Sequence, residues 1–595
     1  MLKFQDRVAV ITGSGTGIGK AIATKFVENG ASVVILGRRK EPLEETAASL
    51  QEIVRKVKSN AFVKIFAGVD VSDEAGISSM FDELKKSGIT VDVVVNNAGV
   101  SGPVTCFANS PIAEFKSTVA IHLTGTFWTS IQALKAMKAG CKIITISTFF
   151  AEERPLEQRP YRFRSPYTAS QGAKNRLAEA MSWELTDKGI ISIATNPGPV
   201  HSDRIYKTVY PKAAAEFMRV SGFESLSPQD VEQVNNDILP LMGEDEKTVK
   251  EGIKNATAKL AKAKGIASPT EIEKLNATIS SLLTKIQQIA EKVQLNTSKM
   301  IADEQFLSQP QVAATVLALC DDEIAKILNG KVIPGDRVFY PVKPHITSSV
   351  PETTVDFGSK VVVFTVDANE DSDINRVEFL SQSIEKSGGK VVLLFSKSTT
   401  KQNQERLSKF HSHAIDFTNP EEVRRIFKTA SEKIGPISMI VHVTGKVPAF
   451  SKITELSRSQ WDSLVDKFIN IPAIIGQEGL NCFVPDGSKN PPLFKGKSGT
   501  MLIIGPDLPS GSKVSGSERA KIDVFRGALR PFTTTVNQEL SDVLKSNLRI
   551  FLVLPGSIDG TDPNNERIFN TIKYFASGKA VSSSEVIFYP DEIRS

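Results

Sequence analysis

The sequence predicts an α/β protein with two tandem, doubly wound parallel sheets, of which the first carries a helical insertion and the second is a degenerate copy. Short β-branched runs alternate with amphipathic helical stretches over the first 200 residues, a pattern typical of βαβ units. The same pattern returns after about residue 355. A chain of 595 residues is also too long for one hydrophobic core, which favours tandem units.

The expected strands are short runs that are apolar on both faces, as in a sheet covered by helices on both sides. In the first copy they are Val8–Ile11, Val33–Leu36, Val91–Val95, Ile143–Ile146 and Ile190–Ala194, with a last strand near Lys331–Tyr340. In the second copy they are Val361–Phe364, Val391–Phe395, Met439–Val443, Met501–Ile504 and Ile550–Leu554. We therefore expect one domain over residues 1–345 and another over 355–595, joined near Pro341–Thr354.

A helical insertion is expected at about residues 205–310. Its clearest helix begins at Ser268, where a proline and Glu271 complete a capping-box sequence. Apolar residues then follow at alternating spacings of three and four: Ile272, Leu275, Ile279, Leu282, Ile286, Ile289 and Val293. This seam fits a long helix that packs on its own domain, and it also fits an intermolecular coiled coil.

Composition excludes several classes of protein. Lys and Arg total 72 against 67 Asp and Glu, a net charge of +5, so no global nucleic-acid footprint is present. No apolar run is long enough to cross a membrane, and the first strand begins so early that no signal peptide is expected. The four cysteines follow no CxxC spacing, which disfavours disulfides and metal binding and fits a cytoplasmic location.

A glycine-rich turn follows the first strand and opens a helix. Glycines let backbone amides approach a pyrophosphate, and the start of a helix favours its negative charge. The position between strand and helix is the one found in Rossmann-like folds that bind dinucleotides. The expected cofactor contacts from this turn are Thr12, Gly13, Ser14, Thr16, Gly17, Ile18 and Gly19.

Two arginines, Arg38 and Arg39, follow the second strand, where an acidic residue would bind a ribose 2′-hydroxyl. A carboxylate there would repel a 2′-phosphate, whereas guanidinium groups bind it. The sequence therefore predicts NADPH rather than NADH as the cofactor.

Four segments together make the chain resemble the short-chain dehydrogenase/reductase family over about residues 4–205. They are the Thr12–Gly19 turn, Asn96-Asn97-Ala98-Gly99, Tyr167-Thr168-Ala169-Ser170 and Asn196-Pro197-Gly198. The resemblance implies further cofactor contacts from Asp70, Val71, Asn97, Ala98, Gly99, Pro197 and Gly198. Dimerisation through the helix that begins after Tyr167 is common in the family, and a homo-oligomer, as a dimer, is expected.

The family's catalytic pattern is only partly present. The resemblance makes Thr148 the residue that positions the carbonyl and Tyr167 the proton donor, with Tyr161 as a competitor. Gln171 stands where the family has the lysine that binds the nicotinamide ribose, and it lacks that lysine's positive charge. His122 stands where a supporting asparagine is usual. Lys174 lies about one helical turn beyond the lysine position, from which its long side chain could reach back.

The second copy has no glycine turn and no tyrosine before the equivalent helix around Val524–Leu529, so we expect it to bind no cofactor. The chain thus combines one active copy, an insertion and one degenerate copy. This plan resembles one half of the bifunctional malonyl-CoA reductases of phototrophic bacteria, and the C-terminal half more than the N-terminal half. That resemblance implies an NADPH-dependent reduction of a carboxylated acyl-CoA thioester or semialdehyde. Arg164 and Arg204 are the predicted substrate contacts, within two arginine-containing segments that flank the expected site. A generic ketone or 3-oxoacyl reductase and a catalytically impaired, cofactor-binding partner subunit are the alternatives.

Overall fold

The computed structural model describes residues 3–148, 151, 162–200, 205–299, 301, 304–335, 350–450, 452–487, 490–509, 511–557, 559–582 and 585–591. It contains two seven-stranded parallel sheets, which confirms the predicted fold class. The first has the order β3-β2-β1-β4-β5-β6-β7 and the second β10-β9-β8-β11-β12-β13-β14, the same order of strands in each copy. The join near Pro341–Thr354 lies mostly outside the described residues.

The strands of the first sheet are β1 (Val8–Thr12), β2 (Ser32–Gly37), β3 (Val63–Ala67), β4 (Val93–Asn96), β5 (Lys142–Ile146), β6 (Ile191–Pro197) and β7 (Val332–Gly335). Those of the second are β8 (Val361–Val366), β9 (Lys390–Ser396), β10 (Ser412–Ile415), β11 (Ile437–Val443), β12 (Ser498–Ile504), β13 (Asn547–Val553) and β14 (Ile587–Phe588). The short apolar runs in the sequence predicted the ten inner strands, but they gave no range for β3, β10 or β14. These are edge strands, and β3 and β10 are only partly buried, so they lack a continuous apolar run.

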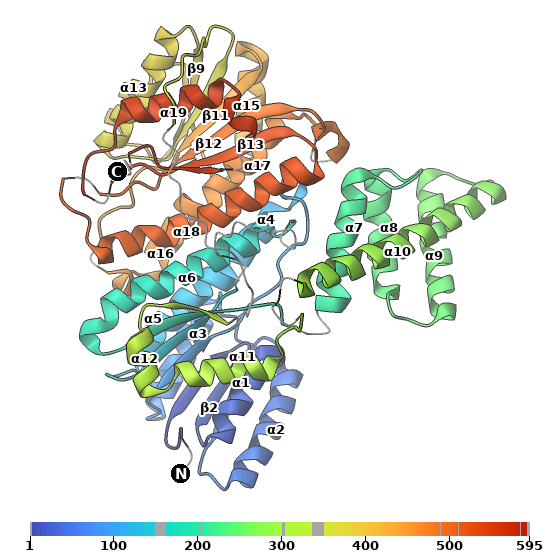
Figure 1. Ribbon diagram of the computed structural model, residues 1–595, viewed down its shortest axis with the longest axis vertical. Coiled ribbons are helices and arrows are strands. Elements are labelled where there is room, and N and C mark those ends of the chain that lie inside the picture. The colour runs from blue at the N-terminus through green and yellow to red at the C-terminus, as the bar shows by residue number, and fades with distance from the viewer. Residues whose placement is uncertain are drawn as a thin grey trace.

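Helices cover both faces of each sheet (Figure 1). Around the first sheet they are α1 (Gly17–Glu28), α2 (Lys40–Val57), α3 (Glu74–Lys86), α4 (Ile112–Val119), α5 (Gly125–Leu134), α6 (Ser165–Leu185), α11 (Gln309–Leu319) and α12 (Asp322–Leu328). Around the second they are α13 (Asp371–Lys386), α14 (Lys401–Leu407), α15 (Pro420–Ile434), α16 (Arg458–Val465), α17 (Ile471–Phe483), α18 (Gly516–Gln538) and α19 (Asn565–Ala576).

The insertion forms a helical projection beside the first sheet (Figure 1), with α7 (Tyr210–Ser221), α8 (Pro228–Ile238), α9 (Glu246–Lys264) and α10 (Pro269–Ser298). The heptad seam of α10 is buried against the other three helices in one apolar cluster. The structure thus accounts for the seam by packing within the insertion, without a coiled coil between chains. The helix begins where predicted, but the Ser268 side chain makes no capping hydrogen bond.

The two halves of the molecule meet along α6 and α18, which run side by side between the sheets (Figure 1). The helices cross where Gly172 faces Gly527: a Cβ on Gly172 would lie 2.1 Å from the Gly527 carbonyl oxygen. Nearby, the rings of Phe127 and Trp461 stack with centroids 4.0 Å apart. Residues from both halves form one continuous apolar cluster, so the contact between the halves resembles a domain core.

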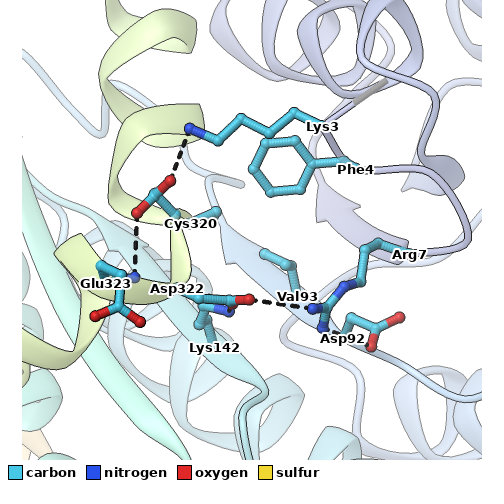
Figure 2. A pocket seen from close by; sticks show the side chains of 10 residues that line it. Lys3, Phe4, Arg7, Asp92, Val93, Lys142, Cys320, Asp322 and Glu323 are labelled. Carbon is cyan, nitrogen blue, oxygen red and sulfur yellow. Dashed lines mark hydrogen bonds and ion pairs between the residues drawn. The ribbon is translucent and has the colours of Figure 1, made fainter. Parts of the chain in front are cut away.

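An ion-pair network closes the amino-terminal edge of the first sheet, the edge opposite the glycine turn. Lys3 pairs with Asp321 at 2.7 Å, while Asp322 contacts both Arg7 and the nearly buried Lys142. Figure 2 shows these charged groups around a pocket between the N-terminus and α12. These pairs join the start of the chain and β5 to the start of α12.

Candidate active site

The glycine turn between β1 and α1 has the geometry that a close backbone approach requires. Gly13 and Gly17 have φ of 66° and 61°, a region that favours glycine. A Cβ on Gly19 would lie 2.4 Å from the Gly13 carbonyl oxygen, whereas beside Gly17 the space is open. The first turn of α1 holds no acidic residue, and the Thr16 side chain makes no capping hydrogen bond. The start of α1 can therefore accept an anion.

The segment after β4 lies against this turn. Thr12 Oγ1 accepts hydrogen bonds from the amides of Asn97 and Ala98, both at 2.9 Å. Asn97 Nδ2 in turn donates to the Thr12 carbonyl at 2.9 Å. Gly99 passes so close to His122 that a Cβ would lie 2.3 Å from the imidazole ring. The structure thus brings together two predicted cofactor segments that are 85 residues apart in the chain.

The two arginines after β2 extend over the same edge of the sheet. Arg39 Nη2 donates to Thr16 Oγ1 at 3.5 Å, and Arg38 lies 3.6 Å from a carboxylate oxygen of Asp70. Asp70 also accepts hydrogen bonds from Ser72, so its carboxylate shapes its own turn. The Val71 side chain is buried against Gly125 of α5, which leaves only its backbone for a cofactor contact.

Tyr167 lies in the first turn of α6, half-buried beneath Arg164. The Arg164 guanidinium lies 3.9 Å from the centroid of the tyrosine ring and donates to the Ser101 carbonyl at 3.1 Å. The His122 ring stands nearly perpendicular to the same tyrosine ring, with centroids 5.3 Å apart. Thr148 follows β5 and is buried, and its neighbour Ser147 donates to the Gln171 carbonyl at 3.0 Å. A cation and an imidazole therefore surround the predicted proton donor.

The two departures from the family pattern contact each other. Gln171 Nε2 lies 3.3 Å from His122 Nδ1, and His122 Nε2 lies 2.8 Å from the Val100 carbonyl oxygen. A proton on Nε2 of the imidazole satisfies these two contacts, whereas the Val100 amide, whose nitrogen lies 3.2 Å from Nε2, requires that nitrogen to be unprotonated. The Gln171 side-chain oxygen is buried and has no hydrogen-bond partner among the described residues, so it can accept one from a ligand.

Lys174 does not reach back toward Tyr167. Its Nζ donates to the Ile146 carbonyl at 2.6 Å, at the end of β5, and the side chain is completely buried. Burial lowers the pKa of Lys174 to about 7. The possibility that this lysine replaces the missing one at the tyrosine is thus wrong, because its position on α6 points it into the core.

Other predicted residues lie at the edges of the site. Pro197 ends β6 and Gly198 follows it, at the carboxyl edge of the sheet where open α/β sheets bind ligands. Arg204 and the competing Tyr161 lie outside the described residues.

The equivalent edge of the second sheet is filled by charged side chains. Arg376 and Asp507 form an almost fully buried ion pair at 2.6 Å, and Asp373 accepts the Lys446 amide at 3.1 Å. Arg526 donates to the carbonyls of Pro506 and Pro555, both at 2.8 Å. Asp371 and Asp373 lie in the first turn of α13, where their charges oppose binding of a pyrophosphate.

Sequence reasoning missed the contribution of the second half to this site. Glu539, Gln477 and Trp461 all contact segments beside the candidate active site. One signal was available, because Glu539-Leu540 and Glu184-Leu185 occupy the same place near the end of the long helix in each copy.

Comparison with known proteins identifies the family. The model of short chain dehydrogenases matches residues 7–210. A 3alpha-hydroxysteroid dehydrogenase of Mediterraneibacter gnavus is 31% identical over 206 residues, covering 34% of this chain and 78% of that protein. An NADP-dependent (R)-specific alcohol dehydrogenase of Lentilactobacillus kefiri is 31% identical over 205 residues, covering 33% and 74%. The chain therefore belongs to the short-chain dehydrogenase/reductase family of oxidoreductases.

Solved structures extend the similarity to the whole fold. The C-domain of a bacterial malonyl-CoA reductase, crystallised with NADP, matches 99% of both chains with a TM-score of 0.71 at 16% identity. The N-domain of a bacterial malonyl-CoA reductase, also with NADP, covers 98% of this chain and 97% of that one, with a TM-score of 0.66 at 16% identity. The chain thus shares their overall fold along nearly its whole length.

Among the described residues, no helix is long and apolar enough to span a membrane. In the same part of the chain, no three His, Cys, Asp or Glu side chains gather in an arrangement suited to a metal ion.

Proposed function

We propose that the chain is an NADPH-dependent reductase of a carboxylated acyl-CoA thioester or semialdehyde, with its active site at the carboxyl edge of the first sheet. The observation that carries the proposal is the open glycine turn, which has no acid in the following helical turn and is flanked by two arginines. NADP is also the nucleotide in both tandem-fold structures that the chain matches.

The residues present fit a phosphorylated dinucleotide. The glycine turn would hold the pyrophosphate, Arg38 and Arg39 the 2′-phosphate, and Asp70 with the Val71 backbone the adenine. Asn97, Ala98, Gly99, Pro197 and Gly198 would border the nicotinamide and its ribose. The unpartnered Gln171 oxygen could accept a hydrogen bond from a ribose hydroxyl. NADPH supplies the hydride when it is bound.

The chain's own residues would bind and protonate the reacting carbonyl. Thr148 would donate a hydrogen bond to its oxygen, and Tyr167 would donate the proton that completes an alcohol product. Arg164, which covers the tyrosine ring, would bind a substrate carboxylate. With a thioester, the same two hydroxyls would stabilise the oxyanion before the thiolate leaves, a step that needs less help from an acid. Arg204 remains a sequence-based prediction for the same role.

A binding test addresses the cofactor. We expect Arg38→Ala/Arg39→Ala to weaken NADPH binding by about 2–4 kcal/mol, the loss of two charge-assisted contacts, and to change NADH binding little. Calorimetry of both nucleotides measures this difference. An equal loss for both nucleotides would contradict the assignment of the arginines to the 2′-phosphate.

A turnover test addresses the reaction. NADPH oxidation with malonyl-CoA, succinyl-CoA and their semialdehydes should depend on Tyr167, and Tyr167→Phe should lower kcat by about 10²–10⁴-fold without loss of NADPH binding. Good NADPH binding with no turnover of any carbonyl would instead support the second candidate, an impaired partner subunit. The contact between Gln171 and His122 favours that candidate, because both residues replace members of the family's catalytic set.

A homo-oligomer remains a prediction. Because α18 of the same chain covers α6, contact between two chains would have to use another surface.

A further inference from the structure

A buried carboxylate from the second half of the chain holds backbone of the first half next to the candidate active site. Glu539 follows α18 in a π-helical turn, Glu539–Val543, and its side chain is almost fully buried. One oxygen accepts the Phe107 amide at 2.7 Å, and the other accepts the Phe163 amide at 2.6 Å. These amides are 432 and 376 residues away in the chain. Both carboxylate oxygens are therefore used to hold loops of the other half.

The Phe163 amide belongs to a strained turn directly before the catalytic helix. Phe163 has φ of 74°, in the left-handed region, which costs a residue with a side chain about 1–2 kcal/mol. Its ring is buried and packs edge-on against Phe217 of the insertion, with centroids 4.9 Å apart. The next residue is Arg164, which lies over Tyr167. The direction of the Phe163 turn thus sets where the arginine is placed.

The Phe107 amide opens a 3-10 turn, Phe107–Asn109, in the segment between β4 and α4. The Phe107 carbonyl accepts a hydrogen bond from Gln477 Nε2 of α17 at 2.6 Å. The second half therefore holds both the amide and the carbonyl of Phe107. The Thr105 amide donates to the Phe163 carbonyl at 2.9 Å, which joins the two loops directly. Glu539 therefore holds a linked pair of loops.

We propose that Glu539 is a positioning residue for the reaction, supplied by the copy that lacks the glycine turn. By accepting both amides it keeps the left-handed Phe163 turn in place and so holds Arg164 against Tyr167. This inference rests on the proposed function of Tyr167 and Arg164. It also gives the second half a role in catalysis that does not require a cofactor of its own.

Both side-chain oxygens of Glu539 act as acceptors. Burial raises the pKa of Glu539 to about 8, and the two amide donors act in the opposite direction by stabilising the ionised form. Glutamine has the same size but only one acceptor oxygen, and its amide group would meet one of the two N–H donors. Glu539→Gln is therefore a near-isosteric change that must release one loop.

The chain provides a matched control. Glu184 of α6 accepts the amides of Ile453 and Thr454 at 2.7 and 2.9 Å, across the same contact in the opposite direction. It is also buried, but the loop it holds belongs to the second sheet, which lacks the glycine turn and the tyrosine. Glu184→Gln should cost similar stability without disturbing Arg164.

The test compares both variants in the full chain by melting temperature, NADPH affinity, turnover and hydrogen exchange. Both should lower the melting temperature. Only Glu539→Gln should lower kcat, by about ten- to a hundredfold, with little change in NADPH affinity, because a small displacement of the groups around Tyr167 is enough to slow the reaction. It alone should also speed amide exchange at Phe163 and Arg164.

Equal effects of the two variants on kcat, or unchanged exchange at Phe163 in Glu539→Gln, would overturn the inference. If the wild type reduces no substrate, the proposed function fails by itself. Exchange at Phe163 and Arg164 still decides then whether Glu539 holds the loop.

Discussion

His122 and Gln171 show how two unusual residues can form one unit. Each replaces a member of the family's catalytic set, and taken singly each looks like a loss. In the structure the glutamine amide contacts His122 Nδ1 and the other imidazole nitrogen contacts the Val100 carbonyl. A lysine in place of Gln171 would bring a positive charge next to this imidazole. The two departures are therefore expected to be energetically coupled.

A double-mutant cycle measures this coupling. We expect Gln171→Lys alone to increase reduction of a simple ketone little, because His122 occupies the space and hydrogen-bonding position beside it. Gln171→Lys combined with His122→Asn should raise kcat/KM by more than the product of the single effects, with a coupling of about 1–2 kcal/mol. Purely additive effects on kcat/KM would show that the pair does not act together.

The buried Lys174 gives a pH-dependent prediction. Its pKa of about 7 in the folded protein lies below the ordinary lysine value, so the unfolded chain binds more protons between about pH 7 and 10.5. Folding stability therefore gains a component that rises with pH across this window. Lys174→Met removes that component, so its stability advantage over the wild type should be largest at and below pH 7.

Denaturant unfolding at several pH values checks this expectation. The difference in free energy of unfolding between Lys174→Met and wild type should shrink by up to about 1.4 kcal/mol for each pH unit above 7. Lys85→Met, at an exposed lysine of α3, is the matched control. A difference that stays constant from pH 7 to 10 would contradict a lysine that is neutral in the fold.

At the scale of elements, α6 and α18 decide how the molecule is assembled. Both helices place a glycine at their crossing, and both carry a glutamate near the C-terminal end that holds backbone of the other half. Because the family commonly dimerises through the helix that begins after its tyrosine, the two copies here resemble the two subunits of such a dimer joined in one chain.

The crossing predicts the effect of one methyl group. Gly172→Ala would place its Cβ 2.1 Å from the Gly527 carbonyl oxygen, which is backbone and cannot easily move. Although alanine favours the helix, we expect a net loss of about 1–3 kcal/mol from overpacking. The free energy of unfolding measures it. Gly252→Ala in α9 is the control, since its Cβ would meet only the flexible end of Leu241.

The change in the free energy of unfolding should therefore differ in sign or size between Gly172→Ala and Gly252→Ala. A Gly172→Ala protein as stable as Gly252→Ala would mean that the helices can separate at this crossing without cost.

Across the whole molecule, the two halves share a single apolar cluster, so they are not independently folded domains. Phe525, Leu529 and Phe532 of α18 belong to the same cluster as Ala169, Ala173 and Leu177 of α6. Separation of the halves would expose this surface to water at a cost of about 25 cal/mol for each Å² of apolar area.

A fragment of residues 1–345 tests this statement. Without its second half, we expect the fragment to self-associate through α6 or to aggregate, because its apolar helix face has no cover. Light scattering after size-exclusion chromatography measures the mass of the species. A fragment that stays monomeric and melts at the temperature of the full chain would contradict a shared core.

The parallel sheets, the insertion and the glycine turn with its arginines could be predicted from the sequence alone. These follow from local patterns: apolar runs, turn residues and the order of strand, glycines and helix within some 30 residues. From the sequence, Arg164 was predicted only as one of several positive charges near the site. Its place over Tyr167 depends on the Phe163 turn, which no local pattern signals.

Three contacts could be learned only from the packed molecule: Lys174 points into the core, His122 meets Gln171, and Glu539 accepts the amides of Phe107 and Phe163. Each of these contacts joins elements whose relative placement depends on how α6 packs against the first sheet and against α18. That packing arises from buried apolar area summed over both halves, a quantity that no short stretch of sequence contains.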